Sequence, residues 1–250
     1  MKTKLTKLGA TLLCVFALQM SAFAVSYPLY LCGGATAALR PDATVTAALL
    51  PGDRIMWQEF QADGTTPIGT VTEIAVTTAA TAPAYTTASG LATGAHVYKV
   101  FVISAAPNTC SGDVSDPFSL YVLPTSSVTL GAPTVANYCE AGGSATSSVV
   151  TATPSTFDSS LTDVSFAFTW TATKDGAAVS DVTTVGTAAS NVFTINTTAV
   201  GEYTVKTSIA YTVSSGVLKS GDSAGCVQSS GSSTAVKVTA KPGKPVISFT

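Results

Sequence analysis

The sequence predicts an all-β protein made of two β-sandwich domains in tandem. Three observations point to this fold class: a composition rich in strand-forming residues, short runs of alternating polarity, and one set of motifs that occurs twice. Of the 250 residues, 40 are Thr and 27 are Val, and β-branched residues favour sheets over helices. Only 10% of the residues are charged while 46% are hydrophobic, which argues against intrinsic disorder.

The N-terminal residues 1–24 have the features of a secretory signal peptide that is cleaved after Ala24. Three lysines precede an apolar stretch at 8–20, and Ser21–Ala24 ends in the small-x-small pattern of a cleavage site. We therefore expect an exported protein, extracellular or at the cell surface. No second apolar run of about 18 residues follows, so no transmembrane segment is expected. Removing residues 1–24 leaves nine basic against 14 acidic residues, and this balance gives no basic patch for nucleic acid.

The strands are predicted from residues that alternate between apolar and polar. Between 164 and 170, the side chains of Val164, Phe166, Phe168 and Trp170 share one face, and smaller or polar residues occupy the other. The run from 202 to 211 alternates in the same way. Triplets rich in Gly and Asp at 51–53, 62–64 and 174–176 predict hairpin turns. No segment after residue 24 shows a 3.6-residue period of helical length.

The motifs recur in the same order in two units of about 105 residues. Each unit has a short apolar stretch that ends in a Cys, a lone Trp, a Gly-led strand with a Tyr, a second Cys and a closing strand. The members are Cys32, Trp57, Tyr98, Cys110 and 118–123 in the first unit, and Cys139, Trp170, Tyr203, Cys226 and 234–239 in the second. About seven strands per 100 residues with Cys…Trp…Cys order is the pattern of an immunoglobulin-like (Ig-like) sandwich.

This pattern defines the expected domains and their cores. We expect Ig-like domain 1 at 25–124, Ig-like domain 2 at 125–240, and a linker with a C-terminal strand at 241–250. The expected core residues are Trp57, Tyr98, Trp170 and Tyr203.

Four cysteines remain after residue 24, and an even number in an exported chain predicts disulfides. We expect Cys32–Cys110 and Cys139–Cys226, because each of these pairs closes one repeat. A Cys110–Cys139 bridge stays open as an alternative, since only 29 residues separate the two. A metal site would need closer spacing and usually His, so none is expected.

These motifs resemble the Ig-like modules repeated in surface and secreted proteins of the Bacteroidota. The resemblance rests on the first Cys with a Gly pair after it, the Trp, the Gly-led strand with Tyr, and the Cys before the last strand, and it covers nearly all of 27–239. It implies an extracellular adhesive or structural role, without catalytic residues. The tyrosines lie 12 and 23 residues before the second Cys of their units, so the disulfides are expected near the rims of the sandwiches.

Few residues indicate chemistry. His96 is the single His, and we interpret it as a strand-end residue at the rim of a sandwich. The acid pair Asp113 and Asp116 is interpreted as solvated turn residues, since it lacks the dense alternation of a calcium loop. We therefore expect no catalytic residues, no metal and no cofactor.

The function that we predict is that of a non-enzymatic extracellular structural or adhesive protein. Residues 246–250 read as a strand that begins a third repeat. Our hypothesis is that Val246, Ile247 and Phe249 dock on the N-terminal domain of the next copy, which would give a filament joined head-to-tail by strand addition. The alternative for this strand is that it folds back onto its own domain or frays. For the protein, the alternative is a carbohydrate- or protein-binding Ig-like module, whose partners would be other surface proteins or glycans.

Overall fold

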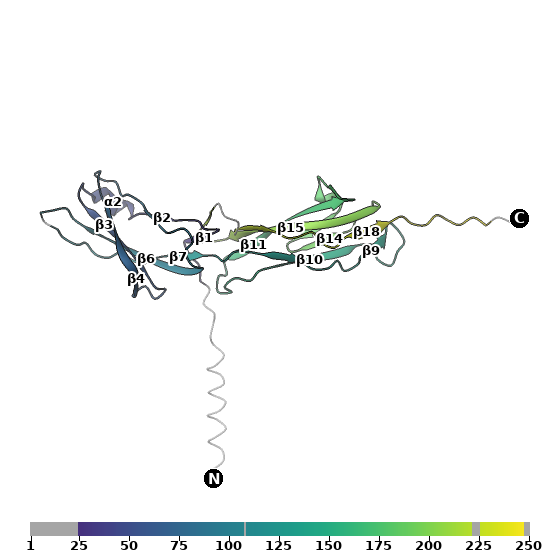
Figure 1. Ribbon diagram of the computed structural model, residues 1–250, viewed down its shortest axis with the longest axis horizontal. Coiled ribbons are helices and arrows are strands. Elements are labelled where there is room, and N and C mark those ends of the chain that lie inside the picture. The colour runs from purple at the N-terminus through teal and green to yellow at the C-terminus, as the bar shows by residue number, and fades with distance from the viewer. Residues whose placement is uncertain (1–24, 108, 222–225, 248–250) are drawn as a thin grey trace, which may run out of the picture.

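A computed structural model describes residues 25–107, 109–221 and 226–247 of the chain. The proposed signal peptide at 1–24 lies outside these residues. The described chain is almost entirely β and forms two domains arranged end to end along one long axis (Figure 1). The all-β prediction with two sandwiches in tandem is confirmed.

In domain 1, a large sheet faces a much smaller one. The large sheet has the order β16-β1-β7-β6-β3-β4, and the small one contains β2 and β5. The elements are β1 (Leu29–Cys32), β2 (Ala38–Leu39), α2 (Ala43–Ala48), β3 (Arg54–Phe60), β4 (Pro67–Ala75), β5 (Tyr85–Thr86), β6 (Gly94–Ile103) and β7 (Phe118–Val122). The six-residue α2 was not expected from the sequence; Asp42 caps it by accepting a hydrogen bond from the Val45 N–H at 2.9 Å.

Domain 2 has two full sheets, ordered β13-β14-β10-β8 and β12-β11-β15-β18-β9, with β17 paired to β15. Its elements are β8 (Val128–Leu130), β9 (Asn137–Cys139), β10 (Ser148–Pro154), β11 (Val164–Lys174), β12 (Ala177–Ala178), the 3₁₀ turn η1 (Val182–Thr184), β13 (Gly186–Ala189), β14 (Val192–Ile195), β15 (Gly201–Val213), β16 (Val217–Ser220), β17 (Val227–Ser229) and β18 (Val236–Thr239). The β11–β12 hairpin turns at Asp175 and Gly176, both at positive φ (50° and 82°), as such two-residue turns require.

The repeat in the sequence corresponds to a repeat in topology. Domain 1 contains the order β1-β7-β6-β3-β4 and domain 2 the order β9-β18-β15-β11-β12. In both, the first strand runs parallel to the last one, β1 beside β7 and β9 beside β18. Each strand of one series therefore has an equivalent in the other.

Each domain has its own apolar core. Trp57 and Tyr98 are 4% and 1% exposed in the first core, and Trp170 and Tyr203 are 5% and 1% exposed in the second. The indole N–H of Trp170 donates to the carbonyl of Ser190 at 3.0 Å. Trp170 and Tyr203 thus lie on the inward faces that the alternation of their strands indicated, and Trp57 and Tyr98 are buried in the first core.

A third apolar cluster joins the two domains. Strand β16, which lies in the second half of the chain, pairs in parallel with β1 and so extends the large sheet of domain 1. At the centre of this joint, the hydroxyl of the fully buried Tyr30 donates to both carboxylate oxygens of Asp163, at 2.7 and 2.9 Å. The pKa of Tyr30 is raised to about 12, mainly because the hydroxyl is buried and secondly because it donates this hydrogen bond to Asp163.

Glycines allow the backbones to approach closely at the joint. A Cβ atom at Gly216 would lie 2.3 Å from the carbonyl oxygen of Tyr27, and one at Gly221 would lie 2.3 Å from that of Gly33. Real side chains do not tolerate such distances, so β16 can reach β1 only because a Gly lies directly before and directly after this strand.

The disulfide of the structure links the domains, and the pairing expected from the sequence is wrong. Cys32 at the end of β1 is bonded to Cys226, 194 residues away, while Cys110 and Cys139 are free thiols. The physical reason is the packing of β16 on β1, which brings the segment before β17 to the end of β1. Cys32 and Cys110 of the first repeat cannot bond to each other, because Cys32 lies near the start of β6 and Cys110 follows the end of that ten-residue strand. Cys226 of the second repeat is not available to Cys139, because it is bonded to Cys32.

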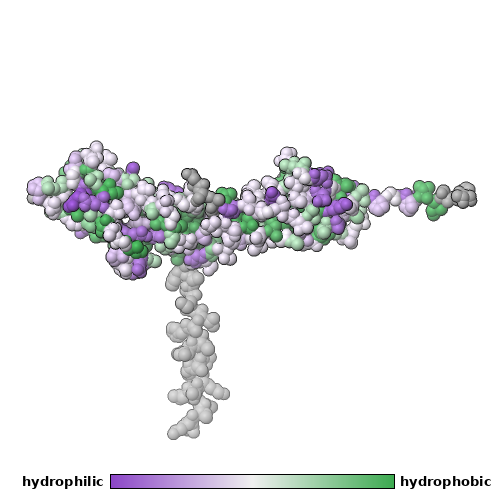
Figure 2. All heavy atoms as spheres, in the orientation of Figure 1, coloured by the Kyte–Doolittle hydropathy of each residue, from purple (hydrophilic) through white to green (hydrophobic). Residues whose placement is uncertain are grey.

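The C-terminal residues up to 247 make no strand. They extend away from the end of domain 2 in Figure 1, and Val246 and Ile247 are 91% and 97% exposed. Figure 2 shows these hydrophobic side chains standing clear of the body of the protein. The described part of the expected strand is therefore unpaired; Phe249 and the rest of 248–250 lie outside the described residues.

Candidate functional site

The small sheet of domain 1 has two described strands where the equivalent sheet of domain 2 has four. In domain 2, β10 pairs with β14 through its first half and with β8 through its second half. Strand β2 of domain 1 is the equivalent of β10. Each follows the first strand of its domain, and β2 pairs with β5 in the way that β10 pairs with β14. Within the described chain, no strand takes the place of β8 beside β2. The sandwich of domain 1 is therefore open on this side.

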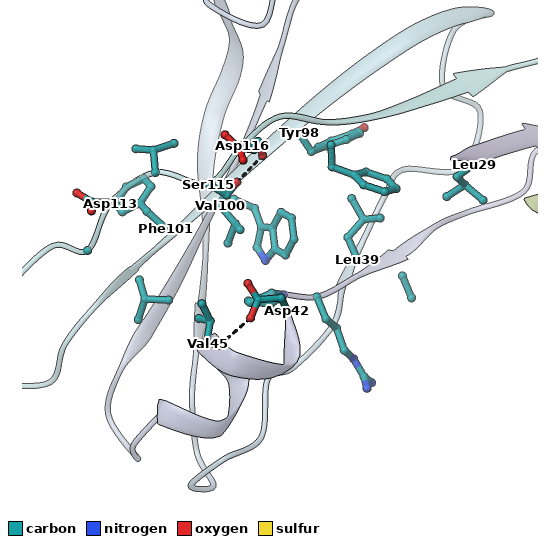
Figure 3. A pocket seen from close by; sticks show the side chains of 18 residues that line it. Leu29, Leu39, Asp42, Val45, Tyr98, Val100, Phe101, Asp113, Ser115 and Asp116 are labelled. Atoms are coloured by element: carbon teal, nitrogen blue, oxygen red, sulfur yellow. Dashed lines mark hydrogen bonds between the residues drawn. The ribbon is translucent and has the colours of Figure 1, made fainter. Parts of the chain in front are cut away.

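A cavity of about 830 Å³ occupies the open side. It lies between residues 38–45 and residues 112–118, and its inner wall includes Trp57, Tyr98 and Val100. This volume is within the range of about 300–1,000 Å³ that is usual for ligand sites. Figure 3 shows Leu39 and Asp42 facing Val100 and Ser115 across the opening.

Two buried polar groups of the wall have no hydrogen-bond partner among the described residues. They are the indole N–H of Trp57 and the hydroxyl of Tyr98. Burial, and to a lesser extent the nearby charge of Glu59, raises the pKa of Tyr98 far above its usual range, so this hydroxyl is protonated at neutral pH. Leaving such a group unpaired costs about 1–3 kcal/mol, which an acceptor brought in by a ligand would recover.

The opening of the cavity is predominantly acidic. Asp42, Asp113 and Asp116 line it together with a single basic residue, Arg40. The segment that carries the last two acids is held along β6, because the N–H groups of Gly112 and Ser115 donate to the carbonyls of Val102 and Val100 at 2.8 and 2.9 Å. The acids interpreted as turn residues thus lie at the cavity.

His96 lies outside this site. Its Nδ1 is 2.7 Å from a carboxylate oxygen of Glu59, and its Nε2 is 2.8 Å from the carbonyl oxygen of Ala92. Neither His96 nor Glu59 lines the cavity. The imidazole is thus a partly buried residue bound to a carboxylate and a carbonyl.

A metal-ion site and a membrane-spanning helix are both absent from the part of the chain that the structure describes. It contains no group of three or more His, Cys, Asp or Glu residues arranged to hold a metal ion. It also contains no helix that is long and apolar enough to cross a membrane.

Comparisons with known proteins find likeness only among solved structures. No family model matches the sequence, and none of the curated proteins matches it. The crystal structure of murine CEACAM1b is 14% identical, with 86% of this chain and 96% of that chain covered and a TM-score of 0.36. The FN1–FN3 domains of chicken CNTN1 are 13% identical, with 84% and 61% covered and a TM-score of 0.38. At such scores the likeness says nothing of a ligand or partner, and the assignment of the fold rests on the sheets and cores described above.

The sequence did not reveal this cavity, although one signal was present. The first repeat begins with the stretch that ends in Cys32, whereas in the second repeat a further strand-forming triplet with apolar ends, Val128–Leu130, precedes the equivalent stretch. Residues 25–28, the described part of the chain before β1, contain no equivalent triplet, and no described strand takes the place of β8 beside β2.

Proposed function

We propose that this protein is a non-enzymatic, exported adhesive protein that assembles head-to-tail into filaments. In this proposal, residues 245–250 of one copy enter the open side of domain 1 of the next copy. The observation that carries the proposal is that, among the described residues, no strand of domain 1 takes the place that β8 has in domain 2. The interdomain disulfide supports an extracellular location, because such bonds persist in oxidising compartments.

The C-terminal segment has the right spacing to supply this strand. Five residues, 123–127, separate β7 from β8, and the same interval after β18 leads to residue 245. This alignment places Ile247 at the position of Leu130, which packs against the core of domain 2. Because side chains alternate along a strand, Phe249 would share the face of Ile247 in a docked strand, and Val246 would face the other way.

Charge and apolar character also match between segment and cavity. Residues 241–250 contain Lys241 and Lys244 and no acid, and the opening of the cavity carries three carboxylates and one guanidinium. Such complementarity favours encounter in the correct orientation. Docking would cover Ile247, which is 97% exposed in the single copy.

The edges of the large sheet of domain 1 are less suitable for strand addition. The β1 edge is already covered by β16. The β4 edge begins at Pro67, contains Gly69 at a positive φ of 67°, and faces a register shift in β3. Proline and irregularities of this kind hinder the pairing of a further strand.

A rigid joint between the domains supports an extended polymer. The contact between copies would be heterologous, with the tail end of one copy on domain 1 of the next, and such contacts build open filaments when the rotation does not close a ring. The strand pairing of β16, the Tyr30–Asp163 hydrogen bonds and the disulfide all hold the two domains of one copy together.

The experiment compares the wild-type mature chain with three variants by electron microscopy and size-exclusion chromatography. Deleting residues 241–250 and replacing Ile247→Asp should both abolish filaments, because an inward-facing charge would be buried unpaired. The matched control is Val246→Asp, whose outward-facing carboxylate should leave assembly intact. Both positions are exposed in the single copy, so neither substitution disturbs folding.

Two results would contradict the proposal. One is filaments that persist after deletion of 241–250. The other is a wild-type chain that stays monomeric at high concentration; glycan-array binding by that monomer would support the carbohydrate-binding module instead. The burial of Trp57 and its stacking on Tyr85 at 5.4 Å argue against that module, because sugar stacking needs an exposed ring face.

A further inference from the structure

The two free cysteines occupy the positions that are bridged elsewhere in the same fold. Cys226 precedes Val227, which pairs with Ala210, and the carbonyl of Cys226 accepts the N–H of Tyr211 at 3.1 Å. In domain 1, Ser111 pairs with Ile103, and the carbonyl of Cys110 accepts the N–H of Ser104 at 2.9 Å. The register is identical, so Cys110 is the equivalent of Cys226.

Cys139 is in the same way the equivalent of Cys32. Cys32 ends β1, which runs parallel to the last strand of domain 1. Cys139 ends β9, which runs parallel to β18 and pairs with Thr239. The observed bridge therefore joins the first-strand cysteine of one domain to the loop cysteine of the domain that follows it.

Within one copy, Cys110 and Cys139 lie too far apart to meet. Cys110 follows the outer end of β6, whose ten residues place it about 30 Å from the joint. Cys139 lies at the outer end of domain 2, a further 40 Å or so along the 13-residue β15. Figure 1 shows β9 beside the departing C-terminal segment and β3, the neighbour of β6, in the opposite domain.

We propose that Cys139 of one copy forms a disulfide with Cys110 of the next, so that the contact between copies repeats the joint between domains 1 and 2. This inference rests on the proposed head-to-tail assembly. In the joint, residues 123–127 lead from domain 1 to strand β8 of domain 2, and Cys32 is bonded to Cys226. Between copies, residues 240–244 would connect domain 2 to the strand that docks in domain 1 of the next copy. Cys139 and Cys110 are the free thiols that would form the equivalent disulfide.

Both thiols can be reached by a partner and an oxidant. Cys110 is exposed, and Cys139 is half-buried, with the hydroxyl of Thr239 donating to its sulfur at 3.7 Å. The oxidant is an external disulfide, of a protein or a small thiol compound. A thiolate displaces one sulfur of that disulfide as a thiol, the second thiolate attacks the mixed disulfide, and the oxidant leaves as two thiols after taking up two electrons and two protons.

The test uses the mature full chain exposed to a glutathione redox buffer, with covalent multimers read by non-reducing electrophoresis. We expect a ladder that reducing agent collapses, and a peptide map with Cys110 linked to Cys139. In an equal mixture of isotopically light and heavy chains, about half of the linked peptides should join a light to a heavy partner if chains pair at random. An exclusively unmixed pair would show a bond within one chain and overturn the proposal.

Two single variants sharpen the test. Cys110→Ser alone and Cys139→Ser alone should each lose the ladder, whereas a mixture of the two should form covalent dimers and nothing larger, since each pair of copies can then make one bridge. Dimers of equal yield from either variant alone would show adventitious oxidation of like cysteines and would overturn the proposal.

Electron microscopy of the same samples separates this inference from the proposed function. Filaments without any Cys110–Cys139 bond refute the disulfide and leave head-to-tail assembly standing. A ladder that survives deletion of 241–250 supports the disulfide and refutes strand donation. The absence of both filaments and ladder refutes both.

Discussion

Three buried tyrosine hydroxyls differ in their hydrogen-bond partners, so replacing each Tyr by Phe measures what one hydroxyl contributes to the free energy of unfolding. The hydroxyl of Tyr30 donates to the buried carboxylate of Asp163, that of Tyr203 donates to the carbonyl of Ala199 at 2.8 Å, and that of Tyr98 has no partner among the described residues. All three side chains are 1% exposed or less. Replacement by Phe keeps the ring and its packing, so the differences report the hydroxyl.

The expected changes in unfolding free energy follow from those partners. Tyr30→Phe should cost about 2–3 kcal/mol, because a hydrogen bond to a charged group contributes about 1.5–3 kcal/mol and the carboxylate of Asp163 would remain buried without it. The same change also removes the acceptor of the Tyr27 N–H, which lies at 3.0 Å. Tyr203→Phe should cost about 1 kcal/mol, the value of a bond between neutral groups. Tyr98→Phe should raise stability by about 1–3 kcal/mol, because it removes a buried hydroxyl that has no hydrogen-bond partner among the described residues.

Equilibrium unfolding in urea, followed by tryptophan fluorescence, measures this series. Trp57 reports domain 1 and Trp170 reports domain 2, so a loss at the joint should appear in both transitions. The slope of free energy against urea should stay constant across the variants, which shows that the exposed surface of the unfolded state is unchanged. A loss for Tyr98→Phe as large as that for Tyr30→Phe would refute the reasoning, as would a Tyr30→Phe loss no larger than that of Tyr203→Phe.

Three further predictions concern the joint and the second core. Cys226→Ser should lower the free energy of unfolding by up to about 5 kcal/mol, because it opens the 194-residue loop that the bond to Cys32 closes. Cys110→Ser should change the free energy of unfolding by less than about 0.5 kcal/mol, and thermal unfolding of both variants compares them. Trp170→Ala should cost about 3–5 kcal/mol in urea unfolding, through lost burial and the cavity left behind, and an unchanged midpoint would contradict the inward orientation of β11. The pKa of Tyr30 is raised to about 12 from its usual value near 10, so its contribution to stability should be complete below pH 10 and be lost as the pH rises to 12. Denaturation scans across this pH range measure that loss, and a stability that does not change with pH would contradict the prediction.

Much of the fold could be predicted from the sequence because the relevant signals are local. A strand that is buried on one face must alternate, so the run from Val164 to Trp170 defined both its secondary structure and its orientation. The repeated motifs then gave two domains, since equal patterns of strands and turns fold to equal topologies. The hairpin at Asp175 and Gly176 was predictable for the same reason, because a tight turn depends on its own two residues.

The tertiary structure alone decided which cysteines pair and where the candidate site lies. Both depend on segments far apart in the chain: β16 must reach β1 before Cys226 can meet Cys32, and the gap beside β2 exists only in relation to β8 of the other domain. Alternation and turn residues describe each segment by itself, whereas contacts across 194 residues depend on how completed sheets pack. The sequence by itself therefore determined strands, turns and two domains. Packing between the domains determined the joint and which thiols stay free, and strand pairing within domain 1 determined its open side.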